Sequence, residues 1–467
     1  MDGAQALSTL WRAADLPLGA LDNARLTGTD PVLDSSFAVG AAAQSSVCAA
    51  ALAATQLGLQ RNGMQQAITV DMREAALECF FRFTVDGKTP ELWDKLAGVY
   101  PCATGGLAGA WVRVHTNFAH HRHDLLRLLG LPEGPRTTRE SVAHALMQWD
   151  AFALEEAAAQ QGALVAAYRT AAEWQAHPQS AALREREVVS IERIADAHPL
   201  NWPALAPSAR PLSGLRVLEL TRILAGPVAG RTLAAYGADV LMVNSPFLPN
   251  IDAIIDTSRG KLSALADLRR AEDRAAFDAV LSEAHVFMQS YRPGSLADLG
   301  YSAEAVAKKR PGIVVVSLSP YGETGPWANR RGFDSLVQTA CGLNHQEAIA
   351  AGGSKPQALP MQILDMASGF LMAFGAQAAL LKQQREGGSW HVHVSLARTA
   401  QWLREFGRVD NGFNEPAPDF SGLMQTCMSG YGELTASRHS ARFSHTPPGW
   451  DRPSMPPGSH ALHWPVD

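Results

Sequence analysis

Between residues 215 and 243 the hydrophobic positions form two short runs on either side of an alanine-rich stretch. The runs LRVLEL (215–220) and VLMV (240–243) are typical of buried strands, and the stretch between them favours a helix. Pro227 suits the first helical position, and Gly237 suits the left-handed residue that closes a helix. These positions predict a β-α-β unit.

The alternation of predicted strands and helices continues toward residue 320. A strand is expected at 285–289, and the β-branched run IVVVSLS (313–319) is of the kind buried in a parallel sheet. Strands alternating with helices predict an α/β fold: a Rossmann-like open parallel sheet with helices on both faces. The loops after Leu220, Gln289 and Leu318 should then face a ligand crevice beyond the C-terminal strand ends.

The loop after the first strand favours a bound phosphate. Arg222 and the free N–H groups of the following helix lie together at the positive end of a helix dipole. The loop has no G-x-G-x-x-G pattern, which argues against an ordinary dinucleotide. A phosphorylated ligand other than NAD or FAD is therefore expected.

One sequence unit is expected to occur twice. Residues 61–79 align without gaps on residues 385–403, an offset of 324, and both segments predict a helix end, a glycine turn, a strand and a further helix. The same offset places Asp365 on Ala41.

The chain is expected to divide into five parts. These are a partial large-domain element (1–80), a smaller α+β domain (81–200), a proline- and alanine-rich linker (201–213), a Rossmann-like domain (214–405), and an extended Pro/Gly-rich tail on the surface (406–467).

Composition narrows the function classes. The net charge of -5 among 467 residues offers no basic surface for nucleic acid. Five cysteines without a C-x-x-C pair argue against a disulfide framework or zinc ribbon, which favours a reducing compartment. With no secretory pattern at the N-terminus, a cytoplasmic location is expected. The alanine-rich run 37–54 predicts a buried helix rather than a membrane span.

Five ordered blocks resemble the family III CoA-transferases, the group that contains formyl-CoA:oxalate CoA-transferase, carnitine CoA-transferase and alpha-methylacyl-CoA racemase. The blocks are LSGLRVLELTRILAGPVAGRTLAAYGADV, RGKLSALADL, QSYRPGSLADLGY, SLSPYGETGPW with GFDSLVQTACG, and LDMASGFLMAFGAQAAL. The resemblance implies that residues 214–405 form a catalytic domain that binds coenzyme A, that a smaller domain completes the site, and that two chains interlock as a homodimer.

The resemblance also implies roles for single residues. Asp365 falls on the family's catalytic aspartate, and Asp334 on an acidic residue beside the thioester. The positions implied to contact CoA are Arg222, Ala225, Gly226, Lys261, Tyr291, Arg292 and Arg331. Acyl-CoA and a small carboxylic acid would be the substrates, without a metal, nucleic acid or membrane partner.

Three departures from the family pattern weaken the implied CoA contacts. Leu262 replaces the arginine of the N-K-R-S block, and residues 244–246 (NSP) replace a glutamate-led basic segment. The glutamine of many transferases falls on Leu224.

Simpler interpretations exist for these residues. Asp365 could cap its own helix, and Arg330 with Arg331 could form a solvated pair. Four histidines (His115, His120, His121 and His123) lack carboxylates at ligand spacing apart from Asp124, so no metal is expected.

The leading hypothesis is transfer of CoA from an acyl-CoA to a carboxylic acid through an aspartyl anhydride and an aspartyl thioester. Racemisation of 2-methylacyl-CoA is disfavoured because Phe333 stands where the racemases carry histidine in a G-H-D triplet. A catalytically weak CoA-binding or dimerisation protein is the third possibility, suggested by Ala41 and the missing basic residues.

Overall fold

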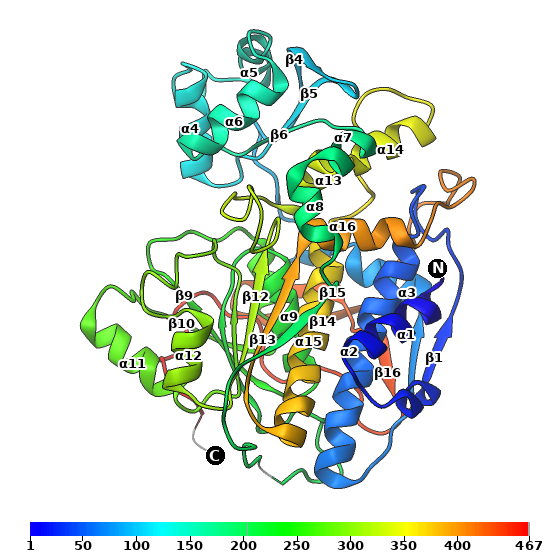
Figure 1. The fold of residues 1–467 in the computed structure, drawn as a ribbon, viewed down its shortest axis with the longest axis vertical. Helices are drawn as coiled ribbons and strands as arrows, with labels where there is room; N and C mark the ends of the chain where they lie inside the picture. Colours follow the sequence, from blue (N-terminus) through cyan, green and yellow to red (C-terminus); the bar gives the residue numbers. More distant parts are fainter. Residues whose placement is uncertain (203, 466–467) are drawn as a thin grey trace.

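The computed structural model describes residues 1–202 and 204–465, and its centre is a seven-stranded sheet (Figure 1). Six strands are parallel: β8 (Arg216–Leu220), β9 (Asp239–Asn244), β10 (Lys261–Leu265), β11 (Val286–Gln289), β12 (Val314–Ser319) and β13 (Ser389–Ser395). Strand β7 (Ser190–Ala195) pairs antiparallel with β13 at one edge. The order β10-β9-β8-β11-β12-β13-β7 is the doubly wound arrangement that reverses direction at β8, so the predicted α/β fold is confirmed.

Alternating strand residues fill two separate cores, as the two-residue period of a strand requires. Val217, Val240 and Val316 face helices α9 (Ala225–Ala235) and α15 (Ile363–Glu386). Leu218, Leu241 and Val315 face α11 (Ala271–Leu281) and α12 (Ala303–Lys309) on the other side. Short helix α10 (Ala253–Thr257) packs against α9.

The smaller domain stands apart at one end of the molecule (Figure 1). Strands β4 (Gly98–Gly106), β5 (Gly109–Val114) and β6 (Val165–Ala167) form its antiparallel sheet, with α4 (Ala119–Leu128), α5 (Arg139–Leu146) and α6 (Ala151–Gln161) around it. Helices α7 (Ala171–Ala176) and α8 (Pro178–Arg184) lead back to β7 in the large sheet. Helices α13 (Asp334–Ala340) and α14 (Leu343–Ala350) lie at the junction of the domains.

The expected repeat is present in the structure. Helix α2 (Val39–Asn62) and helix α15 both have 24 residues and begin 324 positions apart. Strand β2 (Ile68–Asp71) with helix α3 (Met72–Cys79) corresponds to β13 with α16 (Leu396–Glu405). The two long helices pack along each other, so the run 37–54 is buried as expected.

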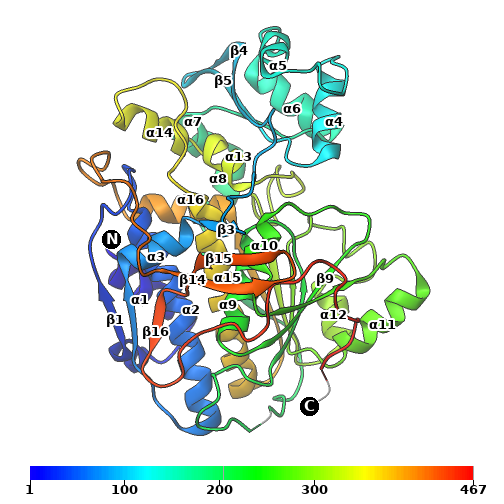
Figure 2. The ribbon, with the colours of Figure 1, turned by 180° about the vertical axis from the view of Figure 1, so that it is seen from behind.

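Strand pairing repeats in the two halves as well. Strand β13 lies between parallel β12 and antiparallel β7, and β2 lies between parallel β1 (Ala24–Thr27) and antiparallel β16 (Ala441–Phe443). Strand β7 follows the first copy in the chain but joins the sheet of the second, and β16 follows the second copy but joins the first (Figures 1 and 2). The halves thus exchange one strand each.

The expectation of an extended tail at 406–467 is wrong. Strands β14 (Met424–Ser429) and β15 (Gly432–Ser437) pair with β3 (Phe83–Val85), and Trp464 is buried beside α11. The glycine and proline content was a poor guide because this hairpin is completed by β3, which lies more than 300 residues earlier in the chain. The N-terminus adds α1 (Gly3–Ala13) and the 3₁₀ turn η1 (Leu18–Asn23).

Among the described residues one helix, α15, is long and apolar enough to cross a membrane by those two criteria. Its most apolar window is 94% buried inside the fold. We therefore describe α15 as the central core helix.

Candidate functional site

The loops after β8 and β11 meet where the strand order reverses. The N–H of Arg222 donates to Ser290 Oγ at 3.1 Å, and the N–H of Ser290 donates to the carbonyl of Leu220 at 3.3 Å. Ile223 follows with a φ of 64°, a left-handed conformation that is strained for a β-branched residue. The sheet therefore holds this loop in a conformation that its own sequence disfavours.

The arginine pocket, as we name it, opens beside these loops and measures about 260 Å³. Residues from the loops after β8, β11 and β12 line it together, as expected from the sequence. Its four arginines are Arg222, Arg292, Arg330 and Arg331.

These arginines differ in how far other residues engage them. The guanidinium of Arg222 lies 4.8 Å from the ring centre of Phe118, and burial lowers its pKa. Its Nη2 donates to the Pro249 carbonyl, whereas within the described chain its Nε has no hydrogen-bond partner. Arg330 instead pairs with Glu155 at 3.5 Å and Glu156 at 2.5 Å. Arg292 and Arg331 are exposed at the rim.

The apolar pocket adjoins the arginine pocket and measures about 290 Å³. The two share Leu248, Tyr291 and Ser295. Asn244 and Ser245, from the segment where the family pattern has basic residues, line this pocket, as does the ion pair of Asp267 with Arg269.

The Asp365 pocket adjoins the arginine pocket on its other side and measures about 220 Å³. The two share Ile223 and Phe333. Asp365 is 8% exposed and lines this pocket together with Leu224. The three pockets thus follow one another from the outer edge of the sheet to Asp365.

Asp334 rather than Asp365 caps helix α15. Asp365 is the third residue of the helix, and its N–H donates to Asp334 Oδ2 at 2.9 Å. Gln338 Nε2 donates to Asp334 Oδ1 at 2.5 Å. The interpretation of Asp365 as the cap of its own helix is therefore wrong.

Burial raises the pKa of Asp365 well above its ordinary value, and the nearby Asp334 raises it further. Burial also raises the pKa of Asp334, but the hydrogen bonds from Asp365 N–H and Gln338 oppose that shift. Because Asp334 accepts these bonds, its ionised form is the better stabilised of the two. Asp365 is the member of the pair that favours a proton.

Three residues that the resemblance implies for CoA binding lie away from the pockets. Lys261 is completely buried, and its Nζ pairs with Glu219 at 2.8 Å and donates to the Pro227 carbonyl at 2.8 Å. Its implied role in CoA binding is wrong because the ammonium neutralises a buried carboxylate. Ala225 and Gly226 are buried at the start of α9, and a Cβ on Gly226 would lie 2.5 Å from the Thr221 side chain. Gly226 therefore serves close packing of loop and helix.

Other pocket residues were not expected from the sequence. Phe80, Phe81, Trp93 and His115 line the Asp365 pocket although they come from the N-terminal half. No local motif marks them, because their position depends on how the two halves assemble.

His115 stacks on Phe333 with ring centres 4.1 Å apart. Burial lowers the pKa of His115 to about 3, so the imidazole is neutral at physiological pH. Two of the other cluster histidines, His120 and His121, also lie against aromatic rings, whereas His123 Nδ1 lies 2.6 Å from Glu133. His115, His120 and His121 are thus part of a cluster of aromatic rings.

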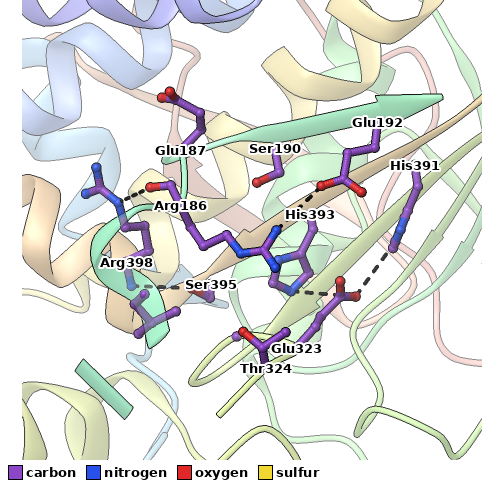
Figure 3. A pocket seen from close by; sticks show the side chains of 12 residues that line it. Arg186, Glu187, Ser190, Glu192, Glu323, Thr324, His391, His393, Ser395 and Arg398 are labelled. Atoms are coloured by element: carbon purple, nitrogen blue, oxygen red, sulfur yellow. Dashed lines mark hydrogen bonds and ion pairs between the residues drawn. The ribbon is translucent and has the colours of Figure 1, made fainter. Parts of the chain in front are cut away.

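A separate pocket of about 110 Å³ lies between β7, β13 and the loop after β12 (Figure 3). His393 Nε2 lies 3.0 Å from Ser319 Oγ and 3.8 Å from Glu323, so both groups approach the same ring nitrogen. A serine-histidine-carboxylate triad needs them at opposite nitrogens. This cluster therefore fixes the loop after β12 to β13 and is not a nucleophilic site.

Comparisons with known proteins agree with this geometry. A model of CoA-transferase family III matches residues 212–432. An acyl-CoA transferase of Gibberella moniliformis is 31% identical over 62% of this chain and 53% of its own length. A succinate–glutarate CoA-transferase of Agrobacterium fabrum is 31% identical over 40% of this chain and 51% of its own length.

A crystal structure of Rv3272 from Mycobacterium tuberculosis is 32% identical, with a TM-score of 0.40, over 42% of this chain and 56% of that one. The chain spans about half the length of the curated relatives that it matches. The matched residues contain the six parallel strands of the sheet, the arginine loops and Asp365. Residues 212–432 of this chain therefore belong to CoA-transferase family III.

Proposed function

We propose that this protein transfers coenzyme A from an acyl-CoA to a carboxylic acid, with Asp365 as the nucleophile. The observation that carries the proposal is the row of three joined pockets ending at a buried carboxylate. An apolar pocket, a pocket rich in arginine and a reactive acid match the adenine, the phosphates and the thioester of one acyl-CoA.

The proposed pose uses the residues that remain available for ligands. The adenine lies in the apolar pocket against Tyr291, which also borders the arginine pocket. Arg222, Arg292 and Arg331 meet the phosphates, since Arg330 already holds two glutamates. The pantetheine then passes Ile223 and Phe333 to reach Asp365.

Transfer proceeds through two kinds of acyl intermediate. Ionised Asp365 attacks the thioester carbonyl, a C–O bond forms, the C–S bond breaks, and CoA leaves as a thiolate. The thiolate attacks the aspartyl carbonyl of this anhydride, which releases the first acid as a carboxylate and leaves an aspartyl thioester. The acceptor carboxylate attacks that thioester, and the returning thiolate then takes the new acyl group and frees Asp365.

Each addition places negative charge on a carbonyl oxygen, which requires hydrogen-bond donors. Ser335 lines the Asp365 pocket, is 5% exposed, and its Oγ has no hydrogen-bond partner within the described chain. Gln362 lines the same pocket immediately before α15. We assign the oxyanion contact to these two side chains.

Trapping tests the proposal. The protein is incubated with acyl-CoA and then treated with hydroxylamine or borohydride, and the Asp365 peptide is analysed by mass spectrometry. Modification at Asp365 that is absent from Asp365→Asn supports transfer. CoA binding without any adduct would favour the binding-protein alternative. Racemisation lacks a second base, because Phe333 cannot move a proton and the lowered pKa of His115 makes it a weak base.

A further inference from the structure

We propose that the acyl group and the acceptor acid are uncharged beyond the reacting carboxyl and are apolar, either aromatic or branched. This substrate class deepens the proposed transfer and rests on it. The walls of the Asp365 pocket carry the inference.

Aromatic rings surround much of this pocket. Phe80, Phe81, Trp93 and Phe333 line it, and aliphatic side chains fill most of the remaining wall. An apolar cavity of about 150 Å³ accommodates benzene. The pocket measures about 220 Å³ and so admits one ring or a branched chain beside the thioester.

No arginine or lysine lines the pocket, and all of its lining residues belong to the described chain. His115 supplies no positive charge, since its imidazole is neutral. The guanidinium of Arg113 lies 5.0 Å from the ring centre of Trp93, and Arg113 does not reach the lining. A second carboxylate on the acyl chain would therefore be buried without a counter-ion.

The acidic pair makes such a carboxylate still less favourable. Asp365 lines the same pocket, and Asp334 is completely buried directly behind it. Like charges in a site of low polarity repel strongly, and an unpaired buried charge is costly. Arg113 offsets part of the charge on Asp334, and the other arginines near the site lie in the neighbouring pocket, where we place the phosphates of CoA.

An isosteric pair of substrates tests the inference. Succinyl-CoA and 4-methylpentanoyl-CoA differ by a carboxylate in place of an isopropyl group of similar shape. We expect kcat/KM for the apolar thioester to exceed that for succinyl-CoA on the order of 100-fold or more. Equal values, or a preference for succinyl-CoA, would overturn the inference.

A charge-insertion variant tests the cause. In Phe81→Arg the ratio should move toward succinyl-CoA by about 10-fold or more, because the carboxylate gains a partner. The matched control Leu107→Arg adds the same charge at a side chain that is 85% exposed, and should leave the ratio unchanged. An unchanged ratio in a folded Phe81→Arg protein would contradict the explanation.

A binding experiment distinguishes failure of the substrate-class inference from failure of the transferase proposal. Binding of both thioesters to Asp365→Asn is measured by calorimetry, which needs no chemistry. Tighter binding of 4-methylpentanoyl-CoA supports the pocket inference even if no adduct forms on the native protein. If both thioesters form adducts at equal rates and bind equally well, the inferred substrate class is wrong, whereas the transferase proposal is supported.

Discussion

Asp334 Oδ2 accepts the N–H of Asp365 at 2.9 Å, which joins the two acids at the start of helix α15. One carboxylate holds the helix end, and the other is left free to face the pocket. The same contact that orients Asp365 also places a negative charge beside it, and this raises its pKa.

Substitution of Asp334 should separate these two effects. Asp334→Ala removes the cap and should destabilise the protein by about 1–2 kcal/mol. Asp334→Asn keeps an acceptor oxygen and should recover most of that loss. It also removes the neighbouring charge, so the pH profile of kcat/KM should shift to lower pH. An unshifted profile in Asp334→Asn would show that the two carboxyls are not coupled.

Asp365→Asn should abolish transfer and raise stability. Because the pKa of Asp365 is raised in the folded state, its stabilising contribution is complete below the unfolded pKa and is lost as pH rises through the folded pKa. The stability gained by Asp365→Asn over the native protein should thus grow with pH, reaching about 1 kcal/mol or more at alkaline pH. Thermal melts of both proteins from about pH 5 to about pH 9 measure this gain. Parallel curves would contradict the burial of the charge.

The adjacent arginines should behave differently. Arg331→Met should raise KM for acyl-CoA about 10-fold with little change in kcat, since a phosphate contact is lost. Arg330→Met removes a partner of Glu155 and Glu156, so it should mainly lower the melting temperature. Kinetics at two salt concentrations, with melts as the control, distinguish the roles.

Lys261→Met should destabilise the protein by about 3–5 kcal/mol, because it leaves the Glu219 carboxylate buried and unpaired. Adding Glu219→Gln should restore much of the stability. The folded double mutant is expected to keep the native KM for acyl-CoA. A large rise in that KM would show that Lys261 does contribute to coenzyme binding.

Ser335→Ala should lower kcat about 10- to 100-fold while binding of CoA stays unchanged, if its hydroxyl meets the oxyanion. Ser302→Ala, in the cap of α12, is a control for general effects of hydroxyl removal. A normal kcat in Ser335→Ala would reassign the oxyanion contact to Gln362 alone.

Four strands of the large sheet, β8, β9, β11 and β12, were predictable because each is a short apolar run set by local sequence. The paired long helices were also predictable, since the offset of 324 residues preserves helix, turn and strand together. The exchange of β7 and β16 between the two halves was not predictable. Nothing in the local sequence of either strand indicates which strand it pairs with.

Some residues of the candidate site were likewise predictable from the sequence, and others were not. Motif resemblance indicated Asp365, Asp334, Arg222 and Tyr291, all of which lie at or directly behind the joined pockets. It failed for Lys261, whose place in the motif says nothing about the buried Glu219 that pairs with it. Trp93 and His115 were not predicted as pocket residues, because only the folding of distant parts of the chain against each other brings them to Asp365.

Oxygen transfer into Asp365 tests the covalent mechanism most directly. Acceptor acid labelled with heavy oxygen in its carboxylate forms the second anhydride, and the returning thiolate leaves one labelled oxygen on the aspartate. Mass spectrometry of the Asp365 peptide after turnover should find that label, absent from a control without acyl-CoA. Full transfer with an unlabelled Asp365 would contradict a nucleophilic role for this carboxyl.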